Sequence, residues 1–196
     1  MTIEQVKCKL QSMLTPKRFA HSLAVRDASI RLAQHYGVDE HKAAAAGLLH
    51  DCAKGLSEEQ LLKLADEFGI LIDSIQKSEA GLLHAPIGAE LARKEFDVHD
   101  REILTAIRYH TTGCEDMGLL AKIICLADFI AEGRNFPEVE DLRRIAFADL
   151  DAALLMGMDL TIKHVISKGS LIHPDTVKAR NNLILRNPQP GIKACD

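Results

Sequence analysis

Helical spacing of apolar residues runs through almost the whole chain, and the alternation of apolar and polar residues that is typical of strands appears nowhere at length. Start and stop signals divide this pattern into segments. Thr15-Pro16 is a typical N-cap and first-turn pair, and Gly37 is a natural C-terminal stop. Ser57, with Gln60 three residues later, forms a capping box. These signals predict an all-α fold, an irregular bundle of many helices.

The chain has 196 residues, of which 47% are hydrophobic, enough for one compact domain with a substantial core. We expect a single domain over 1–196, with a core of about 16–186. The last ten residues, NPQPGIKACD, contain two prolines and a glycine and are expected to form a flexible tail, 187–196. The expected helices span about 16–36, 39–50, 57–68, 86–96, 100–110, 117–132, 138–147, 150–168 and 174–185.

Composition argues against several classes of function. The net charge is -4, with both signs interspersed, so no basic surface for nucleic acid or an anionic membrane is expected. The chain has no tryptophan and only 4% aromatic residues, which argues against a base-stacking platform. The N-terminal segment lacks the apolar core of a signal peptide, and the run AAAAGLL is too short to span a bilayer. We therefore expect a cytoplasmic protein.

The five cysteines are widely separated, and none forms a C-x-x-C pair. Their odd number and wide spacing predict neither a disulfide framework nor a zinc knuckle. We expect them to be isolated core residues or idle surface thiols.

The stretch GLLHDCAKG at 47–55 is the first candidate for chemistry. An apolar run stops there at His50 and Asp51, two residue types that bind metals and move protons. Their side chains can converge on an ion that lies beside the helix end, but solvated polar residues at a helix terminus explain the pair equally well. Lys54 follows on the same side of any continuing turn, where its ammonium suits a phosphate oxygen.

Other polar residues also interrupt apolar faces. His21 lies on the apolar face of its predicted helix, His84 stands at a helix start before Ala85-Pro86, and His110 ends the run ILTAIRYH. Each alone is more simply a core or surface histidine. Asp128 is the sharpest case, because KIICLADFIAEG places an acid in the middle of an apolar helix, and burial of an unpaired carboxylate is costly. Such an aspartate needs a cation.

The order His21, His50-Asp51, His84, His110, Asp128 is more specific than any of its members. Four imidazoles and two carboxylates suit iron, manganese, zinc or another borderline divalent metal and match poorly to the oxygen cage of calcium. One cation would explain several polar residues that are otherwise awkward on apolar faces.

This order resembles the signature of the HD superfamily of metal-dependent phosphohydrolases. The resemblance extends, over about 18–181, to the bacterial YqeK family, HD-domain hydrolases that cut diadenosine tetraphosphate symmetrically. The matching stretches are RFAHS (18–22), AGLLHDCAKG (46–55), HAPIGAE (84–90), AIRYHTTG (106–113), KIICLADFIAEGR (122–134) and IHPDTVKARN (172–181). Because these stretches include residues beyond the ligands, the match is specific.

The resemblance implies a divalent metal, most simply iron, with one or two ions bound. His21, His50, Asp51 and Asp128 would hold the principal metal, and His84 and His110 would serve either a second metal or the phosphates. Roles in nucleotide binding fall to the following residues: Arg18, Lys54, His84, Tyr109, His110, Arg134, His173 and Arg180. For Arg18, a solvated surface position is an equally good interpretation.

The expected reaction is attack of metal-bound hydroxide on an inner phosphorus of diadenosine tetraphosphate, which gives two ADP. Asp51, Lys54, His84 and His110 are the predicted catalytic residues. Either His84 or His110 would protonate the leaving group, and the sequence does not choose between them. The expected ligand is a dinucleoside polyphosphate or an ADP-like nucleotide, and the chain is a candidate homodimer. An HD-type nucleotide phosphatase, a di-iron HD oxygenase and a non-catalytic nucleotide-binding module are the alternatives.

Overall fold

The computed structural model describes residues 1–186, which contain eleven α-helices, one 3₁₀ helix and no strand. The all-α prediction is therefore confirmed for this part of the chain. The expected flexible tail at 187–196 lies outside the described residues.

Most helices begin and end close to the positions that the sequence predicts. In chain order the elements are α1 (Ile3–Met13), α2 (Pro16–Tyr36), α3 (Glu40–Leu49), α4 (Glu58–Glu67), α5 (Ser74–Ser78), η1 (Ala80–Leu83), α6 (His84–Glu95), α7 (Arg101–Tyr109), α8 (Leu119–Ile130), α9 (Val139–Ile145), α10 (Leu150–Ser167) and α11 (Pro174–Arg186).

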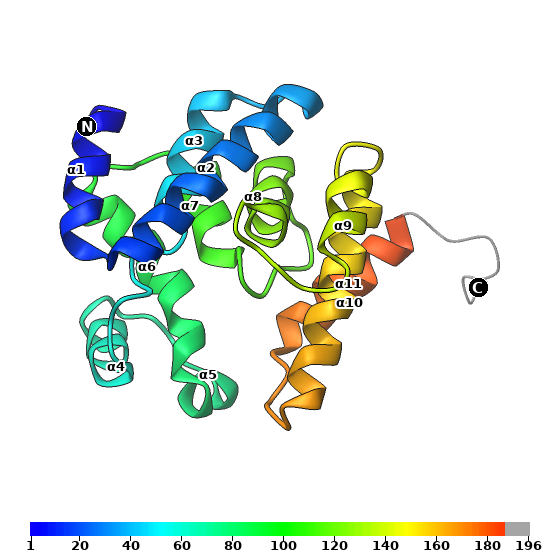
Figure 1. Ribbon diagram of the computed structural model, residues 1–196. Helices are drawn as coiled ribbons and strands as arrows, with labels where there is room; N and C mark the ends of the chain where they lie inside the picture. The colour runs from blue at the N-terminus through cyan, green and yellow to red at the C-terminus, as the bar shows by residue number, and fades with distance from the viewer. Residues whose placement is uncertain (187–196) are drawn as a thin grey trace.

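Helix α8 lies at the centre of the bundle (Figure 1). It packs against α2, α3 and α7 on one side and against α9 and α10 on the other. Its sequence LLAKIICLADFI is apolar on nearly every face, as expected for a helix that neighbours surround. Residues such as Ile123, Ile124 and Leu126 are fully buried there. The last turn of α8 carries Asp128, so the central helix also supplies a polar residue to the protein interior.

The apolar interior has two parts. The main core surrounds α8, and Val6, Leu10 and Leu14 from the N-terminal segment belong to it. The core thus reaches further toward the N-terminus than residue 16, where we expected it to begin. A smaller cluster lies beneath α4, η1 and the start of α6, at the lower left of Figure 1, and includes Leu61 and Ile87. Helix α6 joins the two parts, and its first residue is His84.

The predicted helix signals act as expected. The Thr15 side chain accepts a hydrogen bond from the Arg18 amide, Gly37 ends α2 in the left-handed conformation at φ 70°, and Ser57 and Gln60 form a capping box. Helix α6 begins two residues before Pro86, where we expected it to start. Proline is tolerated there because the first amides of a helix have no acceptor within the helix.

Two further differences bear on the site. Helix α5 and the η1 turn were not predicted, although Asp73 and Gln76 form a capping box that marks the start of α5. Helix α8 ends at Ile130, so Asp128 lies in its last turn and not in its middle as we expected. There its side chain contacts His21 of α2 and Arg134, which follows α8 in the chain.

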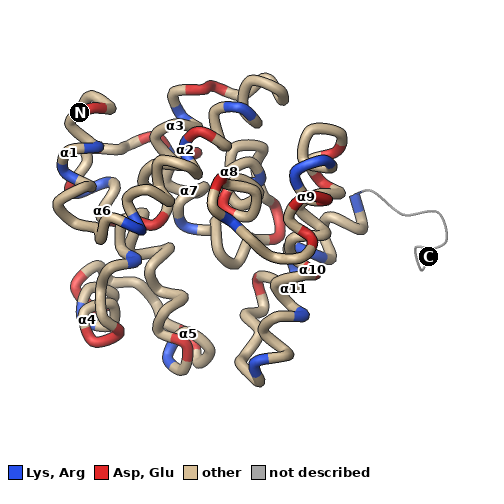
Figure 2. Tube along the Cα trace, in the orientation of Figure 1, with Lys and Arg blue, Asp and Glu red and all other residues tan. Residues whose placement is uncertain are grey.

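Charged residues of both signs are interspersed along the whole described chain (Figure 2). Among residues 1–186, no helix combines the length and the apolar character needed to cross a bilayer. The four cysteines within this range are all free thiols, and Cys52 and Cys125 are buried, which agrees with the expectation of isolated residues.

Candidate metal centre

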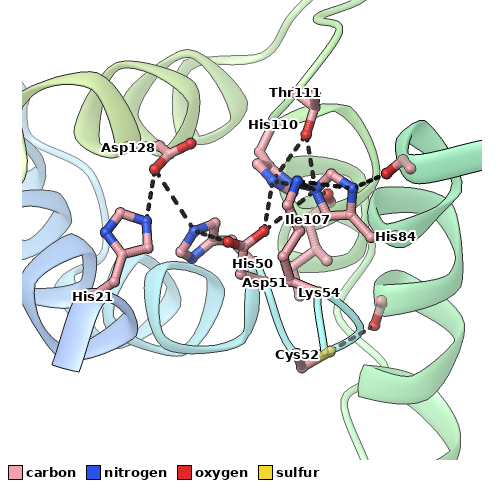
Figure 3. Close-up of polar contacts among 12 residues, drawn as sticks. His21, His50, Asp51, Cys52, Lys54, His84, Ile107, His110, Thr111 and Asp128 are labelled. Carbon is pink, nitrogen blue, oxygen red and sulfur yellow. Dashed lines mark hydrogen bonds and ion pairs between the residues drawn. The ribbon is translucent and has the colours of Figure 1, made fainter. Parts of the chain in front are cut away.

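Six side chains that lie far apart in sequence meet at one place in the bundle (Figure 3). They come from α2, from the end of α3, from the first residue of α6, from the residue after α7 and from the last turn of α8. They form three overlapping groups in which the ligand atoms lie within 4.8 Å of one another: His21, His50 and Asp51; His50, His110 and Asp128; and Asp51, His84 and His110. All six residues that the sequence analysis selected as metal ligands are thus brought together.

Three of the histidines are oriented by the backbone. The Nδ1–H group of each donates to a carbonyl three residues earlier in the chain: His50 to Gly47 at 2.8 Å, His84 to Gly81 at 2.5 Å and His110 to Ile107 at 2.8 Å. A carbonyl oxygen only accepts, so the proton of each neutral ring is on Nδ1. Each ring therefore presents the lone pair of Nε2 to the cluster, the arrangement that metal-binding histidines require.

The Asp51 carboxylate lies among these lone pairs. Its Oδ1 atom is 3.2 Å from His84 Nε2 and 3.4 Å from His110 Nε2, and its Oδ2 atom is 3.6 Å from His50 Nε2. The His50 Nε2 atom is buried and has no hydrogen-bond partner. The lone pair of His50 Nε2 and the Asp51 carboxylate therefore face one another without a hydrogen bond and repel one another, so this ligand set fits a bound cation.

Burial and the proximity of imidazoles and carboxylates also shift the pKa values of His50, His84 and Asp51. Burial lowers the pKa of His50 to about 4, although the carboxylates of Asp51 and Asp128 oppose the shift. Burial also lowers the pKa of His84, so both rings are neutral at neutral pH. For Asp51, burial alone would raise the pKa, but His110 and His84 outweigh it and hold the pKa well below its usual range. Neutral imidazoles around an ionised carboxylate are a ligand set in its metal-binding protonation state.

Asp128 has a different environment. Its Oδ1 atom lies 2.8 Å from His21 Nε2 and forms an ion pair with the Arg134 guanidinium, whose Nε–H also donates to the Asp128 carbonyl at 2.7 Å. Burial opposes ionisation of Asp128, but His21, His50 and Arg134 hold its pKa well below the usual range. We expected a cation beside this buried aspartate, and Arg134 provides one.

Lys54 and Thr111 lie on the other side of Asp51. The Lys54 ammonium donates to His84 Nε2 at 3.0 Å, and burial lowers the pKa of this lysine. The Thr111 hydroxyl lies 3.0 Å from His110 Nε2 and 3.1 Å from His84 Nε2. These two groups can reach a ligand that approaches His84 and His110.

The cluster forms part of the wall of a cavity of about 1010 Å³. The cations on this wall are four: Lys17, Arg18, Lys54 and Arg134. The chain is acidic overall, yet the cavity presents positive charge beside the metal ligands, which suits a polyphosphate. Asn135 and Phe136 line the same cavity and add an amide and an aromatic ring.

A second cavity, of about 370 Å³, adjoins the first. The two share Arg18, Lys54 and Thr111, and His84 lines only the smaller one. The position of Arg18, which the sequence left open, is thus on the walls of both cavities.

Three of the predicted nucleotide-binding residues line neither cavity. Tyr109 ends α7, and its ring centroid lies 5.8 Å from the Arg108 guanidinium carbon. His173 is buried before α11, with Nε2 at 3.1 Å from Asp73 Oδ2, and Arg180 on α11 donates to Asp159 at 2.8 Å. The residues that they contact, Arg108, Asp73 and Asp159, lie outside the metal cluster. Their roles in nucleotide binding therefore stay predictions.

The sequence analysis did not select Thr111, Asn135 or Phe136. All three lie next to predicted site residues in the sequence. Thr111 follows His110, and Asn135 and Phe136 follow Arg134. This adjacency was the one feature of the sequence that could have pointed to them as site residues. Without the fold, nothing in these residue types indicated that they face a cavity.

Comparison with known proteins agrees with this geometry. The model of the HD domain family matches residues 18–132. The chain is 40% identical to the symmetrical bis(5'-nucleosyl)-tetraphosphatase of Halalkalibacterium halodurans, over 88% of this chain and 91% of that protein. It is 35% identical to the protein of the same name from Bacillus subtilis, over 94% and 98% of the two chains.

A solved structure is also similar. The crystal structure of a predicted HD superfamily hydrolase involved in NAD metabolism, from Clostridium acetobutylicum, superimposes with a TM-score of 0.93 at 43% identity. The match covers 95% of this chain and 99% of the other. From the matched segment, the ligand geometry and these relatives together, the chain belongs to the HD domain family and, within it, to the group of the symmetrical bis(5'-nucleosyl)-tetraphosphatases.

Proposed function

We propose that the protein is a metal-dependent hydrolase that cleaves diadenosine tetraphosphate symmetrically into two molecules of ADP. The observation that carries the proposal is the Asp51 carboxylate among three imidazole lone pairs, beside a cavity lined with Arg18, Lys54 and Arg134. The substrate and the symmetry of cleavage are supported by the names of the relatives that match over most of the chain.

His21, His50, Asp51 and Asp128 would hold the principal ion. His84 and His110 would hold a second ion together with Asp51, which directs one oxygen toward His50 and the other toward those two histidines. Iron is the proposed native metal, and two ions are the proposed number. A divalent cation at this position supplies an activated water and withdraws charge from the phosphoryl oxygens.

The side chains of the cavity have distinct proposed roles. Lys54, Arg18 and Arg134 would bind the phosphates and neutralise the charge that develops on the phosphoryl oxygens during cleavage. His84 and His110 are the candidates for the general acid if only one ion binds. Each has its Nδ1–H committed to a backbone carbonyl, so a ring that acts as the general acid would have to take up a proton at Nε2 before it gives that proton to the leaving group.

The test is chromatography of the products that the purified, metal-loaded protein forms from diadenosine tetraphosphate, together with elemental analysis of the protein. ADP as the sole nucleotide product supports the proposal. Equal amounts of AMP and ATP, or no cleavage by protein with its full metal content, would contradict it. Elemental analysis also decides among iron, manganese and zinc and gives the number of ions for each chain.

The alternatives predict other results. A nucleotide phosphatase would release inorganic phosphate from a mononucleotide, and a di-iron oxygenase would consume oxygen and leave diadenosine tetraphosphate intact. A binding module would form a complex without turnover, but it has no use for six converging ligands. The homodimer and the cytoplasmic location are further proposals, which sedimentation analysis and cell fractionation test directly.

A further inference from the structure

The smaller cavity has a chemical character of its own. On the side that it shares with the larger cavity, Arg18 and Lys54 provide positive charge. The remainder of its lining is formed chiefly by three leucines and two glutamates, which line only this cavity: Leu56, Leu61, Leu82, Glu58 and Glu79. The charged residues that it shares with the larger cavity are thus basic, and the carboxylates that line this cavity alone are those of Glu58 and Glu79.

This lining disfavours a polyphosphate beside Glu58 and Glu79, because their carboxylates would repel it. It suits a neutral group with an apolar surface and hydrogen-bond donors. A nucleoside has both: its base can pack on the leucines, and its amino and hydroxyl groups can donate to the carboxylates. The volume of about 370 Å³ is at the small end of the range for ligand pockets, appropriate to one nucleoside but not to a whole dinucleotide.

We propose that this smaller cavity binds one nucleoside of the dinucleoside polyphosphate while the larger cavity binds the other. The polyphosphate then crosses the shared wall at Arg18, Lys54 and Thr111, next to Asp51 and His84. The bond broken in symmetrical hydrolysis lies midway between the nucleosides, and the shared wall lies between the two cavities. The inference rests on the proposed function for its substrate class.

The test uses two ligands that cannot be cleaved at the central bridge. One is the analogue of diadenosine tetraphosphate with a methylene group between the two middle phosphorus atoms. The other is adenosine 5'-tetraphosphate with the same methylene bridge, which has one nucleoside only. Dissociation constants are measured by calorimetry with the metal-loaded full chain. We expect the wild-type protein to bind the dinucleoside at least about tenfold more tightly than the mononucleoside.

Leu82→Trp fills the smaller cavity, since Leu82 is half-buried on its wall. We expect this variant to lose the tenfold preference, with a dissociation constant for the mononucleoside within about twofold of wild type. The matched control is Leu71→Trp, because Leu71 is 95% exposed and lines neither cavity. The control should retain the preference. Glu58→Gln, at an exposed position, should reduce the preference about threefold.

Thermal melts of all the variants establish that they fold, and Leu82→Phe replaces Leu82→Trp if the latter melts early. An unchanged preference in the filled variant would overturn the inference. So would an equal loss of affinity for both ligands, or a wild-type protein that does not distinguish them. Because binding is measured without turnover, failure of the inference is distinct from failure of the proposed function, which depends on the products.

Discussion

The two carboxylates of the cluster are held in opposite ways. Asp51 contacts only imidazoles, and its side chain is 10% exposed, whereas Asp128 is paired with the Arg134 guanidinium and its side chain is 24% exposed. On the Asp51 side the Lys54 ammonium donates to His84 Nε2, whereas on the Asp128 side Arg134 pairs with the carboxylate itself. We therefore expect loss of metal to affect the Asp51 side more than the Asp128 side, where Arg134 neutralises the carboxylate.

The largest expected effect is that of Asp51→Asn. This change removes the carboxylate that lies among His50, His84 and His110, so metal content and activity should be lost together. We expect kcat/KM to fall about a thousandfold or more, equivalent to roughly 4 kcal/mol of transition-state stabilisation. Metal analysis and steady-state kinetics measure the two losses.

The stability of metal-free Asp51→Asn is a second test of the difference between Asp51 and Asp128. The amide group of asparagine can donate to His84 or His110, so the variant should melt no lower than metal-free wild-type protein. Full metal retention, or a melting temperature well below that of metal-free wild type, would contradict the assignment of Asp51 as a carboxylate among acceptors.

Acid should destabilise the metal-free protein through protonation of His50, which lies beside Asp51. The pKa of His50 is 6.5 when unperturbed and falls to about 4 in the folded protein because of burial. The unfolded chain thus binds a proton that the folded chain does not, and stability is lost as pH falls from 6.5 toward 4. The expected loss is about 3 kcal/mol over this range.

Chemical denaturation at a series of pH values measures that loss in protein treated with a chelator. His50→Asn lacks the titrating group and should show a smaller slope than wild type over the same pH range. If the two slopes are equal, burial of His50 is not the cause of the acid sensitivity.

Asp128→Asn should have a smaller effect than Asp51→Asn on metal binding. We expect metal affinity to fall by about 10- to 100-fold, because the ligands on the Asp51 side remain. The stability of metal-free protein should fall slightly, by less than about 1 kcal/mol, because the partner of Arg134 is lost and Arg134 is 41% exposed. Equal metal loss in the two variants would remove the distinction between the two carboxylates.

Lys54→Met should separate phosphate binding from metal binding. Methionine has a similar length without the charge, so the metal should be retained while KM for the nucleotide rises about tenfold. Lys63→Met is the matched control, since the Lys63 side chain is 76% exposed and does not line the cavities. Loss of metal in Lys54→Met would instead assign this lysine to the integrity of the cluster.

Thr111→Val should have the smallest effect. Valine has the shape of threonine without its hydroxyl, so the contacts to His84 and His110 are lost and the packing is kept. We expect kcat to fall about threefold, with metal content unchanged, and Thr111→Ser to restore activity. Steady-state kinetics of the two variants at saturating metal measure this difference.

Most helix boundaries could be predicted from local sequence, because a capping residue bonds to backbone groups only a few residues away. Thr15, Gly37 and Ser57 cap the helices that their positions predict. The failures were also local: a short helix after Asp73 offers too few residues for periodicity to identify it. Pro86 was read as a helix start because proline is favoured there, yet the first turn accommodates it equally well at a later position.

The sequence alone determined the residue types and the order of the ligand set, since each of the six interrupts an apolar segment or ends one. Only the tertiary structure decided how these residues are divided around Asp51 and Asp128. It also brought Arg134 to Asp128, and it placed Arg18 and Thr111 between two cavities. Some contacts of the cluster join residues more than 100 positions apart, as for His21 and Asp128. They depend on how whole helices pack around α8, and no local pattern of residues encodes that packing.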